Sequence, residues 1–157
     1  MEKYFTSLDS PVGKLWLTAS PDALCTLSWR KGSFSGMEEK PSHPVLRAAA
    51  KQLKEYFSGK RKSFDLPLKP EGTEFQMKVW RELSRIPYGT TISYGEQAKR
   101  VGDKNAARAV GSANGRNPIA IIVPCHRVVA SSGIGGFGGG LKAKRILLSL
   151  ENPRETN

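Results

Sequence analysis

The first seventy residues contain three short runs in which apolar and polar positions alternate. These runs cover residues 3–8, 14–19 and 23–29, and the segments between them contain the Pro, Gly and Asp residues typical of tight turns. Alternation with a period of two places every second side chain on the same face of a strand. The pattern therefore predicts a short antiparallel meander.

The spacing then changes to that of a helix. Apolar residues recur every three or four positions and stop before Gly59, a residue type that commonly follows a helix end. These positions are Leu46, Ala50, Leu53, Tyr56 and Phe57. The polar segment 32–43 predicts a loop, and residues 63–68 predict one more strand. Residues 1–68 are therefore expected to form an α/β domain, a small antiparallel sheet with a helix.

Residues 69–72, Lys-Pro-Glu-Gly, form the predicted linker to a second domain over residues 73–157. Thr73 and Gln76 have the spacing of a capping box, which satisfies free backbone N–H groups at the start of a helix. Helical spacing follows over residues 75–86, 93–100 and 105–115, and again from about Leu141. The second domain is therefore expected to be mostly helical.

Two segments of the second domain lack helical spacing. Residues 119–123 are entirely apolar and mostly β-branched, which predicts a buried strand. Residues 131–140 are rich in glycine, so they form either a backbone cradle for a phosphate or base, or a flexible turn. The helix that follows is predicted to bury Ile146, Leu147 and Leu150.

The composition adds a strong positive charge. Lys and Arg number 25 and Asp and Glu 14, so the net charge is +11 and the isoelectric point is near 9.9. Such a charge indicates either a polyanionic partner or a basic surface that maintains solubility. Between residues 99 and 127 six basic residues accompany a single acidic one, Asp103, which favours a polyanion there.

The same sequence excludes several classes of protein. No run approaches the roughly 20 apolar residues of a membrane-spanning helix, and the first residues lack the apolar core of a signal peptide. Two cysteines, Cys25 and Cys125, provide neither a disulfide framework nor a CxxC motif for zinc. We expect a cytoplasmic protein with reduced thiols and without a metal or other cofactor.

Cys125 lies where the apolar run ends at Pro124, and His126 and Arg127 follow it directly. Proline cannot continue a central strand, so the thiol is expected at the rim of the core. A neighbouring cation or base can turn such a thiol into a nucleophile, and the alternative is a small buried cysteine with surface neighbours. Cys25 alternates within a predicted strand and is assigned to the core.

The helix predicted over residues 105–115 has two contrasting faces. Ala106, Val110 and Ala113 form the face expected to pack inward, whereas the other face carries small residues and one long side chain, Arg108. Together with the helix predicted over residues 93–100, it has the proportions of a helix-turn-helix. A small-residue face permits close approach, either to another helix or to nucleic acid, and the local basic charge favours nucleic acid.

Longer motifs carry a family resemblance. Asn117-Pro118 leads through the apolar run to Pro124-Cys125-His126-Arg127-Val128. In matching order and spacing stand Phe75 to Trp80, Pro87-Tyr88-Gly89, Ile92-Ser93-Tyr94, Ala106 to Gly111 and Gly139 to Glu151. This series resembles the O6-alkylguanine-DNA alkyltransferases, also called methylated-DNA–protein-cysteine methyltransferases. The resemblance is strong over residues 73–151 and loose over residues 1–68.

The resemblance implies a suicide DNA repair protein. Such proteins flip O6-alkylguanine, mainly O6-methylguanine but also O4-methylthymine, out of duplex DNA and transfer the alkyl group irreversibly to one of their own cysteines. It implies Cys125 as the acceptor, His126 as the relay of the thiol proton through a water, and Glu151 as the carboxylate that polarises His126. Tyr94 would donate a hydrogen bond to the departing guanine, and Asn117 would support the surroundings of the thiol.

The resemblance also implies how DNA is bound. Arg108 would take the place of the flipped base, while the small residues Ala107 and Gly111 would let their helix enter the minor groove. Further DNA contacts are expected from Ser93, Tyr94, Gly95 and Ser131. The base pocket would contain Val128, Phe137 and Gly138. The expected partner is double-stranded DNA containing alkylated guanine, bound by a monomer without a membrane or cofactor.

One departure from the family and one alternative bear on this interpretation. Phe137 and Gly138 stand where the family commonly has Tyr and Ser or Ala, so Gly138 offers only its backbone N–H, which affects the range of alkyl groups accepted. The alternative is a DNA-binding sensor of the alkyltransferase-like type, in which Trp usually replaces the acceptor cysteine. Cys125 favours the enzyme. A cysteine hydrolase would need an oxyanion hole and turnover, and the resemblance provides neither.

Overall fold

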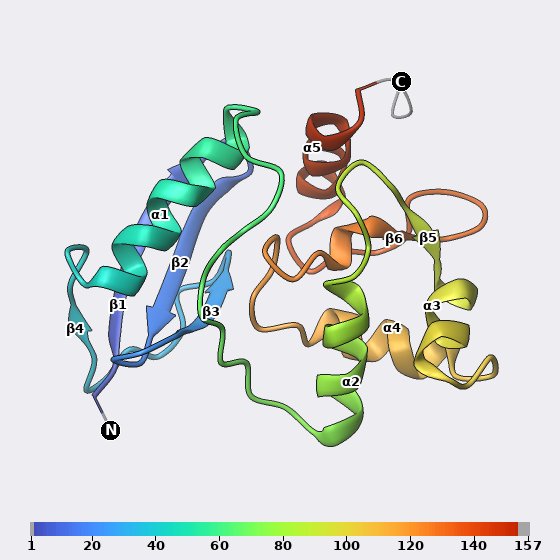
Figure 1. Ribbon diagram of the computed structural model, residues 1–157, viewed down its shortest axis with the longest axis horizontal. Coiled ribbons are helices and arrows are strands. Elements are labelled where there is room, and N and C mark those ends of the chain that lie inside the picture. The colour runs from blue at the N-terminus through green and yellow to red at the C-terminus, as the bar shows by residue number, and fades with distance from the viewer. Residues whose placement is uncertain (1, 154–157) are drawn as a thin grey trace. The chain divides into compact units, whose positions relative to one another are not determined.

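A computed structural model describes residues 2–153 of the chain. The chain divides between Glu71 and Gly72, within the segment predicted as a linker, into an N-terminal unit and a C-terminal unit. Figure 1 shows a sheet with one helix in the N-terminal unit and several short helices in the C-terminal unit. In the described part of the chain, no helix is long and apolar enough to cross a membrane.

The N-terminal unit is a four-stranded sheet in the order β3-β2-β1-β4. Its strands are β1 (Tyr4–Ser10), β2 (Gly13–Ala19), β3 (Leu24–Ser28) and β4 (Glu38–Glu39). The first three pair antiparallel, as the alternating pattern predicts, and helix α1 (Pro44–Phe57) lies along the sheet (Figure 1). Leu15, Leu17, Leu46, Leu53 and Tyr56 are fully buried between them.

Two predictions for this unit are wrong. The segment predicted as a loop contains β4, which pairs parallel to β1, so the sheet is mixed. Residues 63–68 form no strand, and only a single bridge joins Leu68 to Leu24. Pro67 accepts a hydrogen bond from Leu24 through its carbonyl but has no N–H to donate, so the pairing does not extend.

The C-terminal unit is mainly helical. Its helices are α2 (Glu74–Leu83), α3 (Tyr94–Val101), α4 (Ala107–Gly115), the 3₁₀ turn η1 (Cys125–Arg127) and α5 (Leu141–Glu151). A short parallel pair, β5 (Ile92–Ser93) with β6 (Val128–Val129), connects the start of α3 to the residues after η1. The capping box of Thr73 and Gln76 is confirmed at the start of α2. Trp80 of α2 donates from its indole N–H to the Ala113 carbonyl of α4 at 2.9 Å.

The apolar run 119–123 is buried as predicted, but it is not a strand. It folds as tight turns in which Val123 N–H donates to the Ile119 carbonyl at 3.0 Å, and Ile122 is its only half-buried member. Ile121 has a φ of +73°, a left-handed conformation that is uncommon for a β-branched residue. An apolar run indicates that a segment is buried but does not determine its backbone conformation. Pro118 and Pro124, on either side, keep this segment from pairing as a β-strand.

Helix α5 turns a different face inward from the one predicted. Ala143, Leu147 and Leu148 are buried, whereas Ile146 and Leu150 are only half-buried. Two charged residues, Lys144 and Glu151, share the buried face because each finds polar partners inside the unit. The prediction was based on the apolar residues of this helix alone and therefore assigned the wrong face of α5 to the interior.

Candidate active site

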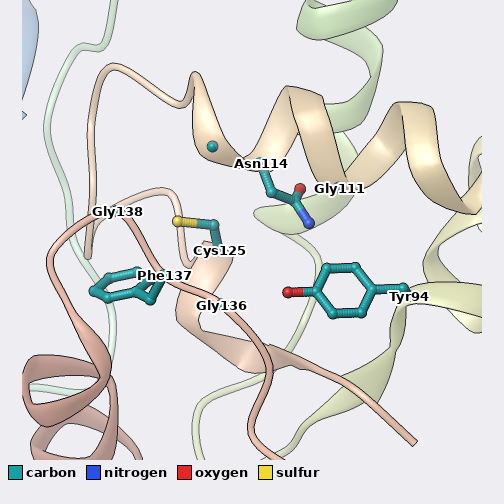
Figure 2. A pocket seen from close by; sticks show the side chains of 8 residues that line it. Tyr94, Gly111, Asn114, Cys125, Gly136, Phe137 and Gly138 are labelled. Carbon is teal, nitrogen blue, oxygen red and sulfur yellow. The ribbon is translucent and has the colours of Figure 1, made fainter.

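A pocket of about 250 Å³ opens in the C-terminal unit where α3, α4, η1 and the glycine-rich loop meet. Figure 2 shows Cys125 among the residues around this space, with the Tyr94 hydroxyl directed toward the side of Cys125. The lining residues are Tyr94, Gly111, Asn114, Gly115, Cys125, Gly136, Phe137 and Gly138. Drug-sized ligands occupy pockets of about 300–1,000 Å³, so this one has room for a smaller group, on the scale of one nucleobase.

Cys125 begins η1 and is half-buried, with its thiol beside the side chain of Asn117. The Asn117 amide donates to Sγ at 3.3 Å and to the Val123 carbonyl at 2.8 Å, while its oxygen accepts from the Ile119 N–H at 3.0 Å. Asn117 therefore holds the turn that carries the thiol and touches the sulfur itself. Burial raises the pKa of the Cys125 thiol, whereas the Asn117 hydrogen bond and the charge of Lys144 act in the opposite direction.

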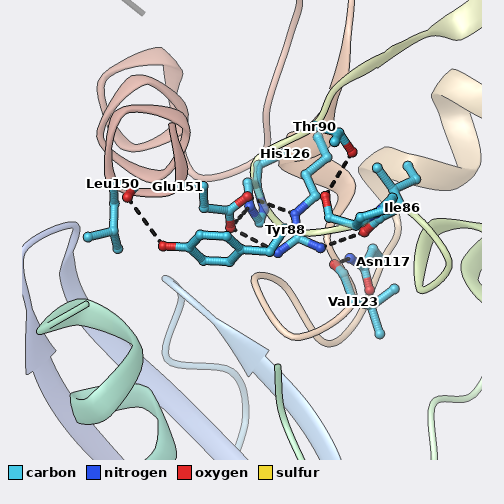
Figure 3. A network of polar contacts seen from close by, with 10 residues as sticks. Ile86, Tyr88, Thr90, Asn117, Val123, His126, Leu150 and Glu151 are labelled. Carbon is cyan, nitrogen blue, oxygen red and sulfur yellow. Dashed lines mark hydrogen bonds and ion pairs between the residues drawn. The ribbon is translucent and has the colours of Figure 1, made fainter. Parts of the chain in front are cut away.

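The two residues that follow Cys125 in the chain belong to a buried polar network centred on Glu151 (Figure 3). His126 Nε2 lies 2.7 Å from one Glu151 carboxylate oxygen, and Arg127 Nε donates to the other at 2.7 Å. Arg127 also donates from Nη2 to Glu151 at 3.1 Å and from Nη1 to the Ile86 carbonyl at 2.7 Å. All three side chains are buried, so both ring and carboxylate are fixed in orientation.

The charges in this network follow from burial and pairing. Burial opposes ionisation of Glu151, but the hydrogen bonds and charges of His126 and Arg127 together outweigh it and hold the Glu151 pKa at about 2. Burial lowers the pKa of His126; the Glu151 hydrogen bond and charge oppose this, and the charges of Arg127 and Lys144 lower it further. We therefore describe the resting site as a neutral imidazole beside a protonated thiol.

A neutral His126 has one N–H. Because the Glu151 carboxylate only accepts, Nε2 carries the hydrogen and Nδ1 is left as an acceptor. Nδ1 is buried and, across residues 2–153, has no hydrogen-bond partner. A buried polar atom without a partner is uncommon, and a catalytic role is one explanation for it. Nδ1 is therefore a candidate proton acceptor.

Tyr94, the first residue of α3, is held closely between glycines. A Cβ at Gly135 would lie 3.0 Å from the Tyr94 hydroxyl oxygen, and one at Gly111 would lie 3.9 Å from its ring. The Gly136 backbone hydrogen-bonds the hydroxyl, but burial has the larger effect and raises the pKa of Tyr94. The hydroxyl is therefore protonated at neutral pH and can donate a hydrogen bond into the pocket.

The residues predicted to bind DNA lie along α3, α4 and the loop after β6. Arg108 is exposed on α4 and Ser131 is exposed in the loop, while Gly95 is exposed in the first turn of α3. Ser93 is the N-cap of α3, where its hydroxyl accepts from the Glu96 N–H at 3.0 Å. Ala107 and Gly111 are half-buried on α4.

The pocket contains Phe137 and Gly138 as predicted members, but Val128 is not among the residues that line it. The Val128 side chain is fully buried in β6, and its carbonyl accepts from Lys144. No group of three residues able to hold a metal ion occurs within residues 2–153.

Sequence reasoning assigned no site role to Arg127, which is buried against Glu151, and it missed two further residues of this site. Asn114 lines the pocket and forms a reciprocal amide pair with Gln97, with hydrogen bonds of 2.7 and 2.8 Å. Lys144 is fully buried beside the pocket-lining loop. The signal for Lys144 was its spacing from Leu147, Leu148 and Glu151 on one helix face; nothing in the sequence indicates the partner of Asn114.

Comparison with known families identifies both units. Residues 3–70 match the ribonuclease-like domain of 6-O-methylguanine DNA methyltransferases, and residues 74–153 match the DNA binding domain of the same proteins. The chain belongs to the O6-methylguanine DNA methyltransferase family. The two matches together span nearly all of the chain.

Individual members of this methyltransferase family are similar over almost their whole length. The methylated-DNA–protein-cysteine methyltransferase of Methanosarcina acetivorans is 47% identical over 154 residues, covering 94% of this chain and 97% of the relative. The protein of the same name from Methanosarcina mazei is 57% identical over 157 residues, covering 94% and 96%.

Solved structures agree with the family assignment. The crystal structure of the Mycobacterium tuberculosis O6-methylguanine methyltransferase has a TM-score of 0.90 at 45% identity and covers 97% of this chain and 94% of its own. A crystal structure of the M. tuberculosis OGT in complex with DNA also has a TM-score of 0.90, at 46% identity, covering 96% and 94%.

Proposed function

We propose that this methyltransferase repairs DNA by transferring the alkyl group of O6-alkylguanine to Cys125 in a single-turnover reaction. The observation that carries the proposal is the Cys125 thiol at a base-sized pocket. His126 lies in the same short turn as Cys125 and is paired with Glu151, the last residue of α5. Family membership supports the reaction, because the relatives are named for methyl transfer to a protein cysteine. O6-methylguanine is the main substrate, and O4-methylthymine is a second one.

The first step is removal of the thiol proton. Nδ1 of His126 takes this proton through one bridging water, since Nδ1 is the free acceptor of the neutral ring. The positive charge that then develops on the imidazole is stabilised by Glu151, which already accepts from Nε2 at 2.7 Å. Asn117, which donates to Sγ, stabilises the thiolate.

The second step is displacement at the alkyl carbon. The thiolate forms the S–C bond while the bond between O6 and that carbon breaks, and its electron pair stays with the guanine. The Tyr94 hydroxyl donates a hydrogen bond to the leaving base and reduces its developing charge. The guanine then regains a proton, so one thiol and one alkylguanine become one thioether and one guanine. Among the residues that the structure describes, we assign none to regenerating the thiol, so the proposed reaction is stoichiometric.

We infer that α3 and α4 bind the DNA as a helix-turn-helix. Gly102, with a φ of +107°, ends α3 and lets the chain turn into α4. The exposed Arg108 and the small residues Ala107 and Gly111 lie near the start of α4, which suits insertion into a narrow minor groove. The O6 atom of guanine is inside the base stack, so the nucleotide has to be extruded, with Arg108 filling its place.

Two single-cysteine variants test the proposal. Cys125→Ser should abolish transfer of a labelled methyl group from an O6-methylguanine duplex, whereas Cys25→Ser should retain it, because Cys25 is buried in β3 of the other unit. Duplex binding by the Cys125→Ser protein serves as the folding control. Transfer by Cys125→Ser, or its loss in a folded Cys25→Ser protein, would refute the assignment.

A further inference from the structure

The N-terminal sheet has an open edge beyond β4. Strand β4 pairs only with Tyr4 and Phe5, the first two residues of β1, whereas β1 continues to Ser10 (Figure 1). Lys40 and Pro41 then lead the chain away from the sheet and towards α1. After Phe5, β1 is therefore the edge strand on this side. An open edge presents unpaired backbone groups and can accept a further strand.

The hydrogen bonds at β4 show which residues of β1 turn their backbone groups toward this edge. The carbonyls of Lys3 and Phe5 accept N–H groups from β4 and from the residue after it, at 3.2 and 2.9 Å. Successive residues of a strand direct their backbone groups to opposite sides, so Ser7 and Asp9 face the same edge. Within residues 2–153, neither Ser7 nor Asp9 forms a backbone hydrogen bond on this side.

A groove of about 530 Å³ lies between this edge and α1. Thr6, Ser7 and Leu8 line it from β1, and Pro41 lines it just before α1. Thr6 and Leu8 pair with residues of β2 that are fully buried, so their side chains belong to the face of the sheet that α1 covers. One face of an added strand would therefore point into the groove, toward α1.

The helix side of the groove carries three cations. Arg47, Lys51 and Lys54 line it, are exposed, and follow one side of α1 at spacings of four and three residues. None of the three forms an ion pair with a residue that the structure describes. The acidic residue of the lining, Glu55, is paired with Arg61 at 2.9 Å. Unpaired positive charge therefore lies beside the unpaired backbone groups.

We propose that this edge of the N-terminal sheet binds an extended acidic segment of a partner protein by strand addition. The backbone of the segment pairs with Ser7 and Asp9, and every second side chain points toward α1, where carboxylates meet Arg47, Lys51 and Lys54. A peptide fits better than nucleic acid, because a phosphate backbone has no N–H group for the free carbonyls of the edge. The site lies wholly within the N-terminal unit, so the inference goes beyond the proposed alkyl transfer and does not depend on it.

The test uses three labelled peptides and the full chain, with binding followed by fluorescence anisotropy. The probe is acetyl-Glu-Val-Glu-Val-Glu-Val-amide. A peptide with Lys in place of Glu reverses its charge, and the fully N-methylated probe keeps the carboxylates but has no backbone donors. Lys51→Glu/Lys54→Glu reverses two cations of the groove. Lys60→Glu/Lys69→Glu is the matched control, since it makes the same charge change at exposed positions outside the lining.

We expect the acidic probe to bind the wild type and Lys60→Glu/Lys69→Glu with affinities within about twofold, and Lys51→Glu/Lys54→Glu at least roughly tenfold more weakly. The basic and the N-methylated peptides should also bind the wild type at least roughly tenfold more weakly. Equal binding of the N-methylated peptide would overturn strand addition. No binding of the acidic probe would overturn the whole proposal, and the lysines would then serve only to keep the edge from pairing with other chains.

Hydrogen exchange of the wild type tests the geometry without any variant. The amides of Ser7 and Asp9 have no acceptor at the open edge, so strand addition should slow their exchange roughly tenfold at about ten times the Kd of the acidic probe. NMR reports each amide separately. Unchanged exchange at both amides with the probe bound would contradict the proposal. Protection of these amides by an undamaged DNA duplex and not by the probe would assign the groove to nucleic acid instead.

Discussion

Glu151 connects the candidate nucleophile to the rest of the C-terminal unit, because it accepts from both His126 and Arg127 inside the protein. Its charge is maintained by these two partners against burial. In the proposed reaction the carboxylate orients the imidazole, keeps Nδ1 as the acceptor and stabilises the imidazolium as it forms. Its contribution is thus to proton transfer and not to DNA binding.

Glu151→Gln should therefore slow methyl transfer by roughly 100-fold or more, the range for loss of a supported general base. DNA affinity should stay near that of the wild type, measured on an undamaged duplex. Glu82→Gln is the matched control, since Glu82 is half-buried and, among the described residues, forms its ion pair with the exposed Arg85 and none with the His126 network. A wild-type transfer rate in folded Glu151→Gln would show that this carboxylate has a structural role alone.

Gly135 lies close to Tyr94 and leaves no room for a side chain between them. Gly135→Ala would introduce a side chain at a φ of +76° and bring a Cβ to 3.0 Å from the tyrosine oxygen and 3.2 Å from the Ala130 nitrogen. We expect the transfer rate to fall by up to roughly tenfold, comparable to the loss in Tyr94→Phe. We also expect a lower melting temperature. Single-turnover kinetics and thermal unfolding measure the two effects.

Gly133→Ala is the control for that change, because a Cβ at Gly133 meets nothing within 4 Å. It lies in the same loop and should leave the transfer rate unchanged. If both alanine variants behaved alike, the loop would act through its general flexibility, and the close approach of Gly135 to Tyr94 would carry no consequence.

At the scale of elements, α4 is proposed to bind DNA through its exposed side and to line the pocket with Gly111 and Asn114. Arg108 is exposed and has no ion pair among the described residues, so it is available to enter a duplex. Arg108→Ala should slow repair of an O6-methylguanine duplex roughly 100-fold, since extrusion of a base costs a few kcal/mol. Reaction with the free base O6-methylguanine should change by less than about threefold on the same scale.

Arg116→Ala, at an exposed position just after α4, is the matched control and should affect both substrates little. The comparison is decided by the ratio of the two rates in each variant. Equal losses on duplex and free base in Arg108→Ala would place that arginine in the chemistry or the fold and not in base extrusion.

Elements with a local signal could be predicted from the sequence, and elements set by distant partners could not. The capping box fixes the start of α2 within the residues that form it. By contrast, β4 is two residues long and exists only because β1 lies beside it. The run 119–123 shows the same limit, since the side chain of Asn117 accepts from Ile119 and helps to set its turn. The inward face of α5 depends on where Lys144 and Glu151 find partners.

The site shows the same division. Cys125, His126 and Asn117 were predicted because they stand close together in one motif. Asn114 and Lys144 were missed because their partners, Gln97 in α3 and the carbonyls of Val128 and Gly136, are known only once the helices have packed. The protonation state of His126 also required the fold, since burial is the largest effect on its pKa and, with the charges of Arg127 and Lys144, lowers that pKa despite Glu151.

At the scale of the whole molecule, the buried network makes stability depend on pH. The Glu151 pKa is about 2 in the folded protein and near 4.5 otherwise, so the unfolded chain binds the proton first as the pH falls. Glu151 thus stabilises the fold fully above about pH 4.5, by on the order of 3 kcal/mol, and this contribution is lost between about pH 4.5 and 2.

Denaturant unfolding of the full chain between pH 7 and pH 2 should therefore show a steep loss of stability in this range. The Glu151→Gln protein should be less stable at pH 7 and should lack this part of the pH dependence, because glutamine does not titrate. Parallel stability curves for the two proteins, offset by a constant amount, would contradict the ionised and paired state of Glu151.

The central claim is that Cys125 itself receives the alkyl group, once per molecule. It is tested most directly by mass spectrometry of the protein after incubation with an excess of O6-methylguanine duplex, intact first and then as peptides. The account predicts one added methyl group per chain, located on the peptide containing Cys125, and an amount of repaired guanine equal to the amount of protein. A methyl group on Cys25, no adduct at all, or repair of many duplexes by one molecule would contradict it.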